Sequence, residues 1–407
     1  MLRNNPIIYK SIKERIRNFG QKMNPKIIIF YTPCGAGHRR AAESIAEGFK
    51  RSGHPDERVI IKNSLEFVNK LAGKLYVKGY DFLLKHALLL WAFFYSVTDV
   101  KFSAPFFKVL RRVYNELTCK GLVKFIKEQS PDVIICTHFL PEEIVCSMKK
   151  KGLYERRLVT CVTDLRVHSF WILDGVDDYV VGGEEGKKDL LRWGVEEKKI
   201  KVFGIPVHPE FSNDLDRQKL CEKLGIKDSV FTILVTAGGL GIGPVKKIVQ
   251  SLTIISEELQ ILVVCGKSPK LFKDLTAFAR SSLEISEPSP YAMNKKKICI
   301  FEFVNNMHEI MSVSDIIISK AGGSTVAEAL AKQLPIIIIR PIPGQEIKNT
   351  EVLVSNNAGI RAYNVQQAIE SVRFLMKDKD HILELKKGIQ KIRKPHSAID
   401  ICRLVLK

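Results

Sequence analysis

The chain has 407 residues, which is enough for two domains of ordinary size. Apolar residues make up 45% of it, a share that fits packed globular domains and excludes a disordered chain. Lysine and arginine total 64 against 44 aspartate and glutamate, and the resulting formal charge of +20 favours an anionic partner such as a phosphorylated substrate, a membrane surface or nucleic acid.

The cysteines and the apolar runs narrow the class of protein further. Nine cysteines are scattered singly from Cys34 to Cys402 without a CxxC pair, which argues against a disulfide framework or a zinc site and favours a reducing, cytoplasmic compartment. The N-terminal segment carries charges throughout and lacks the apolar core of a signal peptide. The longest apolar run, Ala87–Val97, has eleven residues, whereas a spanning helix needs about 20. We therefore expect no membrane-spanning segment.

Short runs rich in valine and isoleucine alternate with longer amphipathic stretches along almost the whole chain. The runs expected to form strands are 26–32, 58–62, 132–136, 158–162, 178–181, 199–204, 231–236, 260–265, 297–301, 315–319 and 335–340. Most are continuously apolar, as parallel strands buried on both faces are. Their alternation with helices predicts an α/β fold with doubly wound parallel sheets.

The strand–helix pattern restarts once. Residues 204–218 contain two prolines and several polar residues, which is typical of an interdomain linker. We therefore expect two Rossmann-like domains, over residues 1–205 and 206–385. The last stretch, 386–407, is expected to be helical and to pack back on the first domain.

One segment, residues 64–128, contains no expected strand and is rich in Phe, Tyr, Leu and Lys. Two interpretations stay open for its amphipathic helices. They could cover the sheet, with their aromatic side chains in the core, or they could form a membrane-interface surface with an apolar and a cationic face. The side chains in question are Trp91, Phe93, Phe94, Tyr95, Phe106 and Phe107, beside Lys101, Lys108, Arg111 and Arg112.

The first glycine-rich loop follows the first expected strand and opens a helix. Gly35 and Gly37 allow close approach of the backbone, and the start of the helix suits an anionic or polar ligand. Arg40 stands where the dinucleotide fingerprint needs a small residue, which disfavours an NAD enzyme. His38, at the tip of the loop, is either a helix cap or a general base that faces a cleft.

Further loops follow strands in the second half. The loop 236–244 carries Gly238, Gly239 and Gly241 but lacks the Lys-Ser/Thr of a P-loop, which disfavours ATP hydrolysis. The strand 315–319 is followed by Gly322, Gly323, Ser324 and Thr325 at the start of a helix. Backbone amides there suit a diphosphate, although Ser324 and Thr325 are also plausible N-caps.

Five polar residues complete the candidate chemistry. Glu328 lies one turn into that helix, within reach of sugar hydroxyls. The next loop carries Gln345, Glu346 and Asn349. Asp164 ends a buried strand in the first half, where ligands of α/β proteins bind, and is either a site residue or a helix cap.

Taken in chain order, these elements resemble glycosyltransferase family 28. This family contains the peptidoglycan enzyme MurG, plant monogalactosyldiacylglycerol synthases and bacterial processive diacylglycerol glucosyltransferases. The resemblance spans about residues 25–375 and is carried by GAGHRRAAESIAEGF, VTDLRVHSFWILDGVDDYVV, VFGIPVHPEF, GGLGIGP, EFVNNMHEIMSVSDIIISKAGGSTVAEAL and PIPGQEIKN. The second and third motifs are more similar to the diacylglycerol branch than to MurG.

The resemblance implies a GT-B fold, in which two Rossmann-like domains enclose the active site in a cleft. It implies transfer of a hexose, with inversion and without a metal, from a UDP-sugar to a diacylglycerol-type lipid on the inner face of the cell membrane. The backbone of Val304 would meet the uracil and Glu328 the ribose. The remaining donor-binding residues would be Gly322, Gly323, Ser324 and Thr325 at the diphosphate, Gln345 and Glu346 at the hexose, and Gly238, Gly239, Gly241 and Asn349.

The resemblance also implies catalytic roles for His38, as the base or as the residue that orients the acceptor hydroxyl, and for Asp164. Gly35 and Gly37 would lie on the acceptor side. The chain departs from the family pattern at Ala36, at Leu240 and at Ile347-Lys348, where relatives commonly have Gly, a polar or acidic residue, and Glu-Gly. These departures bear on which hexose is transferred.

Two alternatives remain. A MurG-like enzyme would use a polyprenyl-diphosphate acceptor in place of diacylglycerol. A non-enzymatic protein that binds nucleic acid or anionic lipid is motivated only by the net charge. It is disfavoured because the basic residues are spread along the chain and no RNP, helix-turn-helix or zinc pattern occurs, so we expect no nucleic-acid partner.

Overall fold

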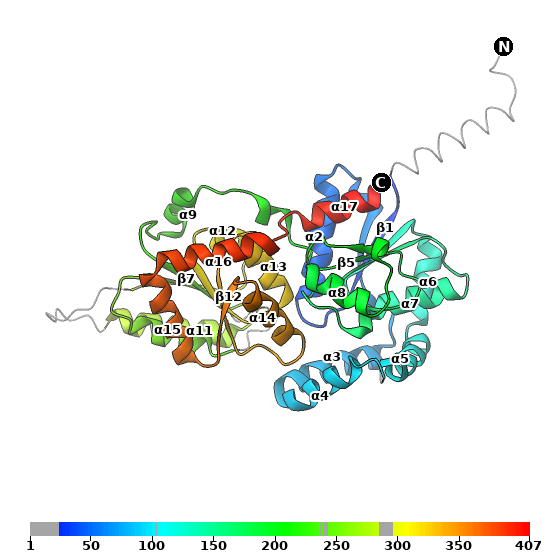
Figure 1. The fold of residues 1–407 in the computed structure, drawn as a ribbon, viewed down its shortest axis with the longest axis horizontal. Coiled ribbons are helices and arrows are strands. Elements are labelled where there is room, and N and C mark those ends of the chain that lie inside the picture. The colour runs from blue at the N-terminus through cyan, green and yellow to red at the C-terminus, as the bar shows by residue number, and fades with distance from the viewer. Residues whose placement is uncertain (1–23, 103, 237, 239–242, 285–295) are drawn as a thin grey trace, which may run out of the picture.

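The computed structural model describes residues 24–407 except 103, 237, 239–242 and 285–295, and its strands form two six-stranded parallel sheets (Figure 1). The first sheet has the order β2-β1-β3-β4-β5-β6 and the second β12-β11-β10-β7-β8-β9. The α/β fold with doubly wound parallel sheets is thus confirmed.

The strands of the first sheet are β1 (Ile27–Tyr31), β2 (Val59–Asn63), β3 (Val133–Cys136), β4 (Arg157–Cys161), β5 (Asp178–Val180) and β6 (Ile200–Lys201). Those of the second are β7 (Thr232–Thr236), β8 (Gln260–Val264), β9 (Lys297–Phe301), β10 (Ile316–Ser319), β11 (Ile336–Ile339) and β12 (Gly359–Ala362). Each of the eleven expected runs contains one of the first eleven strands, apart from end differences of one residue. The edge strand β12 is not among the runs expected from the sequence, because its residues Gly-Ile-Arg-Ala do not form an apolar run.

Helices cover both faces of each sheet (Figure 1). Those of the first half are α2 (Gly37–Arg51), α3 (Lys70–His86), α4 (Leu88–Thr98), α5 (Ala104–Thr118), α6 (Lys120–Gln129), α7 (Phe139–Lys150) and α8 (Glu184–Arg192). Those of the second are α9 (Arg217–Leu224), α10 (Val245–Thr253), α11 (Pro269–Glu284), α12 (Met307–Ser312), α13 (Gly323–Ala331), α14 (Gln345–Ser355), α15 (Val365–Lys377), α16 (Lys379–Ile392) and α17 (Ser397–Leu406). Among the described residues, no helix is long and apolar enough to cross a bilayer.

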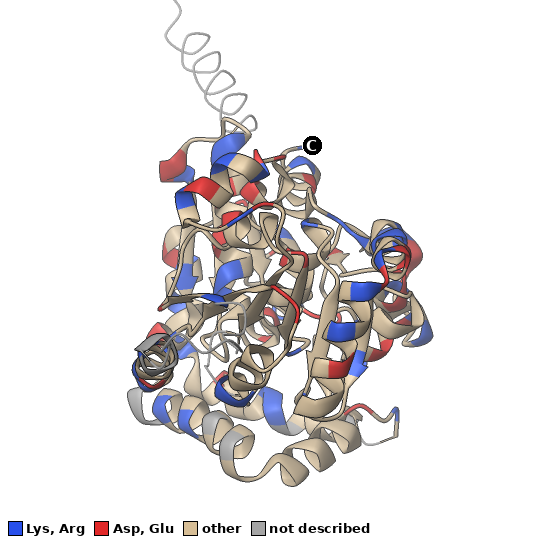
Figure 2. Ribbon diagram, turned by 90° about the vertical axis from the view of Figure 1, so that its left-hand side faces the viewer, with Lys and Arg blue, Asp and Glu red and all other residues tan. Residues whose placement is uncertain are grey.

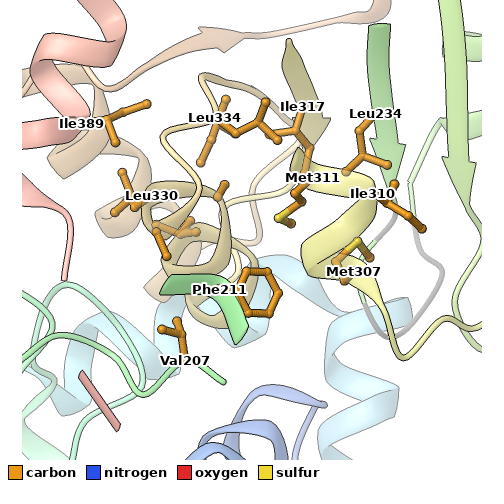
Figure 3. Packing of buried hydrophobic residues seen from close by; sticks show 14 of the residues in the cluster. Val207, Phe211, Leu234, Met307, Ile310, Met311, Ile317, Leu330, Leu334 and Ile389 are labelled. Atoms are coloured by element: carbon orange, nitrogen blue, oxygen red, sulfur yellow. The ribbon is translucent and has the colours of Figure 1, made fainter. Parts of the chain in front are cut away.

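The core explains why the strand runs are continuously apolar. Along β1, Ile28 and Phe30 face one buried cluster, whereas Ile27 and Ile29 face another on the opposite side of the sheet. The second sheet is buried on both faces in the same way. Figure 3 shows one of these clusters, in which Phe211 from the linker lies near Met307 of α12. The linker is therefore anchored in the core of the second domain.

The chain crosses between the domains a second time near its end. α17 packs against α2, where a Cβ at Gly48 would lie 2.9 Å from Cys402 Sγ. Arg157, at the start of β4, donates a hydrogen bond to the Leu404 carbonyl at 2.8 Å. The two segments that cross between the domains are in contact, because a Cβ at Gly204 in the first would overlap the side chain of Lys394 in the second. The C-terminal helix thus joins the first domain and ties both domains together.

Candidate active site

A cavity of about 150 Å³ lies between the two domains, where loops that follow strands of both sheets meet. Ligands of doubly wound α/β folds bind at this end of the strands. The expected site residues that line it are Gly35, Gly37, His38, Asp164, Gly238, Gly322, Gly323, Ser324, Thr325, Gln345 and Glu346. Val304 and Glu328 line a narrower pocket beside it, together with Thr325 and Gly238. Gly239 and Gly241 lie outside the described residues.

Glycines permit the close approach of the domains. A Cβ at Gly323, the first residue of α13, would overlap the carbonyl oxygen of Thr163, which follows β4. A Cβ at Gly37 would lie 3.0 Å from Ser324 Oγ. The cavity is smaller than the roughly 300–1,000 Å³ of ordinary ligand pockets. A neighbouring cavity of about 1100 Å³, lined by Gly35 and Arg40 of the first domain and by Val304 and Glu328 of the second, offers further space for a ligand.

His38 is held by the loop after β3. Its Nδ1 lies 2.6 Å from the Thr137 carbonyl oxygen, which can only accept, so Nδ1 carries the proton and Nε2 has the lone pair. Burial lowers the pKa of His38 to about 4. Ala36 is the N-cap residue of α2 and no side chain caps it, so the helix-cap interpretation of His38 is wrong. A neutral imidazole with a lone pair on Nε2 is suited to accept a proton.

Asp164 and Asn349 meet across the cleft. Asn349 Nδ2 donates to Asp164 Oδ1 at 2.9 Å and to the Ala321 carbonyl at 3.0 Å, while Asn349 Oδ1 accepts from the Leu165 amide at 2.9 Å. Asn349 is fully buried, so the expected direct contact with the donor is corrected to a contact that holds Asp164. Burial raises the pKa of Asp164 to about 6.

The start of α13 has no side-chain cap. Gly322 is its N-cap residue, so the N-cap interpretation of Ser324 and Thr325 is wrong. Lys320, which follows β10, also lines the cavity, and burial lowers its pKa. Lys320 is not among the site residues expected from the sequence, although a cation directly after a buried strand is a usable signal. Helix amides and a nearby ammonium group together suit a polyanion.

Arg40 is a second residue that the sequence analysis did not assign to the site. Its Nη1 lies 3.3 Å from Glu328 Oε1, so α2 and α13 are joined by an ion pair. Burial raises the pKa of Glu328, and the charge of Arg40 opposes this shift. The Glu328 carboxylate thus lines the narrow pocket and also pairs with Arg40 of the opposite domain.

Several buried polar atoms around the cavities have no hydrogen-bond partner within the described part of the chain. They are Ser319 Oγ, Ser324 Oγ, Gln345 Oε1 and Glu328 Oε2. Buried polar atoms are normally paired, so a cluster of unpaired ones indicates a polar ligand. No group of three or more His, Cys, Asp or Glu side chains that could hold a metal ion occurs in the ranges that the structure covers.

Comparisons with known proteins match both halves of the chain. The family model described as monogalactosyldiacylglycerol synthase matches residues 38–207, and that of the glycosyltransferase family 28 C-terminal domain matches residues 232–396. The processive diacylglycerol beta-glucosyltransferase of Bacillus pumilus is 28% identical over 380 residues, covering 92% of this chain and 93% of the relative. That of Bacillus subtilis is 27% identical over 387 residues, covering 94% and 95%.

Solved structures share the fold at lower identity. MurG of Acinetobacter baumannii superposes with a TM-score of 0.56 at 14% identity, covering 94% of this chain and 99% of that one. Anabaena HepE in complex with UDP-glucose has a TM-score of 0.52 at 11% identity, with 94% and 99% coverage. The fold is therefore GT-B. The chain belongs to the glycosyltransferases that combine a monogalactosyldiacylglycerol synthase domain with a family 28 C-terminal domain.

Proposed function

We propose that this protein transfers a hexose from a UDP-sugar to a diacylglycerol-type lipid, with inversion at the anomeric carbon. The observation that carries the proposal is the group of unpaired polar atoms on Ser324, Gln345 and Glu328 beside His38 and Asp164. The diacylglycerol glucosyltransferases of two Bacillus species, which match this chain over almost its whole length, support the choice of acceptor.

The donor would lie along the second domain. Its diphosphate would accept hydrogen bonds from the first amides of α13 and from Ser324, with Lys320 balancing its charge. The uracil would meet the backbone of Val304, and the ribose hydroxyls would donate to Glu328. The unpaired Oε1 of Gln345 would accept hydrogen bonds from hydroxyl groups of the hexose. These groups would supply the charge stabilisation that a metal ion provides in other enzymes.

The reaction would be a single displacement. The acceptor hydroxyl attacks the anomeric carbon, the bond to the diphosphate breaks, and the hydroxyl proton moves to His38 Nε2. The ionised Asp164, which also lines the cavity, would stabilise the positive charge that develops on His38. A UDP leaving group remains bound at the start of α13, where the helix dipole stabilises its charge.

We further propose that the protein docks on a bilayer through α3, α4 and α5. The exposed apolar side chains of these helices and of the segment between α4 and α5 include Leu75, Phe82, Leu89, Phe93, Phe102, Phe106, Val109 and Val113. The exposed Lys74, Lys78 and Lys101 accompany them. Figure 2 shows the long uncharged stretches of these helices, beside a few basic residues, at the bottom of the molecule. An apolar patch with cationic flanks fits an anionic bilayer, which is also the source of a lipid acceptor.

Three of the four cations expected on this surface have other partners, which corrects the expectation. Arg111 forms a largely buried ion pair with Glu143 at 2.9 Å. Arg112 pairs with Glu116 at 3.0 Å, and Lys108 donates to the Ile172 carbonyl at 2.9 Å. Lys101 alone of the four is exposed, and its Nζ lies 5.9 Å from the centre of the Trp193 ring. The apolar side chains therefore contribute more to the proposed surface than the cations do.

The deciding experiment offers UDP-glucose, UDP-galactose and UDP-N-acetylglucosamine to the protein with diacylglycerol vesicles and identifies products by mass spectrometry. We expect a glycosylated diacylglycerol with one of the three donors. If the hexose is transferred to a polyprenyl-diphosphate acceptor and not to diacylglycerol, the proposed diacylglycerol acceptor is wrong. If UDP does not stabilise the protein against thermal unfolding, the protein does not use a UDP-sugar donor, and transfer to either acceptor is excluded.

A further inference from the structure

Helix α4 of the first domain and its C-cap residue Asp99 contact the loop between β11 and α14 and the first turn of α14 in the second domain. Trp91 Nε1 donates to the Pro343 carbonyl oxygen at 3.0 Å. The next residue, Gly344, has φ +92°, and a Cβ there would lie 2.7 Å from the ring of Tyr95. Lys348 Nζ donates to Asp99 Oδ2 at 2.5 Å. The contact thus combines a hydrogen bond, a close packing contact and an ion pair.

These contacts come from one face of α4. Trp91, Tyr95 and Asp99 are spaced four residues apart, so they lie above one another on the helix and at its end. The side chains of Lys348 and Asp99 are 28% and 11% exposed, so water weakens their attraction less than it weakens that of a surface pair. Asp99 is itself fixed, because its Oδ1 accepts from the Ser169 amide at 2.8 Å.

The loop that α4 contacts leads directly into two cavity residues, which begin α14. Gln345 and Glu346 line the cavity, whereas Trp91, Asp99 and Lys348 lie outside its lining. Glu346 Oε2 accepts from the Ile342 amide at 2.7 Å, which fixes its side chain within the loop. Gln345 Oε1 is buried without a partner in the described part of the chain. The position of this unpaired oxygen therefore depends on how the loop is held.

We propose that Trp91, Asp99 and Lys348 are positioning residues for the hexose subsite of the donor. They hold the loop 340–344 and the first turn of α14 in the conformation in which Gln345 and Glu346 face the sugar. The proposal rests on the proposed function, because it takes the cavity to bind a UDP-sugar. The opposite face of α4 carries the exposed Leu89 and Phe93, so one helix would serve both the lipid surface and the donor sugar.

The proposal separates two ligands that differ only in the hexose. UDP would use the start of α13, Glu328 and Val304, none of which contacts α4 through the bonds described above. A UDP-hexose would also use Gln345 and Glu346. Loss of the Lys348–Asp99 pair should therefore weaken binding of the UDP-hexose and leave binding of UDP nearly unchanged. A purely structural role would affect both ligands equally or neither.

The experiment measures affinities for UDP and for the UDP-hexose that the wild-type protein binds most tightly among the three donors. Lys348→Met keeps the aliphatic stem and removes the charge, and it should weaken UDP-hexose binding by about tenfold, as for a hydrogen bond between charged groups. Affinity for UDP should stay within about twofold. Lys348→Arg should restore most of the loss, because its guanidinium can reach Asp99.

Two further variants keep the test sharp. Trp91→Phe removes the hydrogen bond to Pro343 while keeping an aromatic ring beside Tyr80 and Tyr95, and it should shift the UDP-hexose affinity in the same direction by about threefold. Lys387→Met removes an exposed lysine of α16 and should change neither affinity. Unchanged UDP-hexose affinity in Lys348→Met, or equal losses for both ligands, would overturn the inference. Failure of the wild-type protein to bind UDP would instead overturn the proposed function.

Discussion

Arg40 of α2 and Glu328 of α13 form an ion pair across the cleft, with 3.3 Å between Arg40 Nη1 and Glu328 Oε1. The two residues are 288 positions apart in the chain. Glu328 is the carboxylate that we propose for the ribose, so a nucleotide must share it with Arg40 or displace Arg40. The same contact also joins the two domains.

The first prediction concerns the pH dependence of UDP binding. Burial raises the pKa of Glu328, and Arg40 opposes this shift by favouring the charged carboxylate. In Arg40→Met the pKa of Glu328 should rise further. Because binding would use the ionised carboxylate, affinity is lost as the pH falls through that pKa. The acid limb of UDP affinity should therefore move to higher pH, as measured by calorimetry between about pH 5 and 9.

Arg39→Met is the matched control for this variant. Arg39 is the adjacent residue and forms a solvent-exposed pair with Glu43 at 2.7 Å. It should leave the pH profile unchanged. Superimposable profiles for wild type and Arg40→Met would mean that the ion pair does not influence nucleotide binding.

The second prediction is a loss of donor affinity in Glu328→Ala. Removing the carboxylate removes hydrogen bonds to the ribose and should weaken UDP binding by about 1.5–3 kcal/mol. Calorimetry with the folded variant measures this directly, and Glu370→Ala, an exposed position on α15, serves as control. Unchanged UDP affinity would remove Glu328 from the donor site.

The third prediction separates chemistry from binding at His38. His38→Ala should lower turnover by about 10²–10⁴-fold, the usual contribution of a general base. UDP affinity should stay nearly the same, because the imidazole contacts the loops after β3 and β4. Turnover within a few-fold of wild type would assign His38 a structural role.

The fourth prediction is the pH profile of turnover. Both Asp164 and His38 must be deprotonated, so activity should fall as the pH drops through their pKa values, about 6 and about 4. In the wild-type protein, turnover should fall on the acid side near the higher of these two pKa values, that of Asp164. In Asp164→Asn, turnover should be lower and the limb should move down toward that of His38. A wild-type limb already at the lower value would mean that Asp164 need not be ionised.

The sequence predicts the sheets well because their strands are buried on both faces, which requires continuous apolar runs such as that of β1. The edge strand β12 pairs only with β11 and escapes this rule. The glycine loops are also predictable, because close approach at Gly323 admits no side chain. The roles of side chains whose partners are distant in the sequence could not be predicted in this way.

Asn349 and Arg111 illustrate this limit. Each looked suited to an exposed role, at the donor and at the lipid surface respectively. Asn349 instead bonds Asp164, which is 185 positions away, and Arg111 pairs with Glu143, which is 32 positions away. Periodicity and loop chemistry report local conformation and burial, whereas these pairings are set by how the domains and the helical segment pack.

The last prediction concerns membrane docking and uses only exposed side chains. Leu89, Phe93 and Phe102 are 88%, 61% and 95% exposed, so replacing all three with serine should leave the core intact. Full burial of each such side chain contributes about 1.5–3 kcal/mol, so their loss should largely abolish flotation with anionic vesicles. Lys101→Gln should cost only about 1 kcal/mol of vesicle binding, and this contribution should fade as salt is raised.

The matched control replaces Ile254, Phe374 and Leu383 with serine, three exposed apolar residues of the second domain. This variant should float like the wild type. The Leu89, Phe93 and Phe102 variant should retain activity on a detergent-solubilised acceptor, because Trp91 and Tyr95 on the other face of α4 still contact the donor loop. Wild-type flotation of that variant would show that α4 and the segment after it do not form the docking surface, and loss of flotation in both variants would indicate nonspecific apolar adsorption.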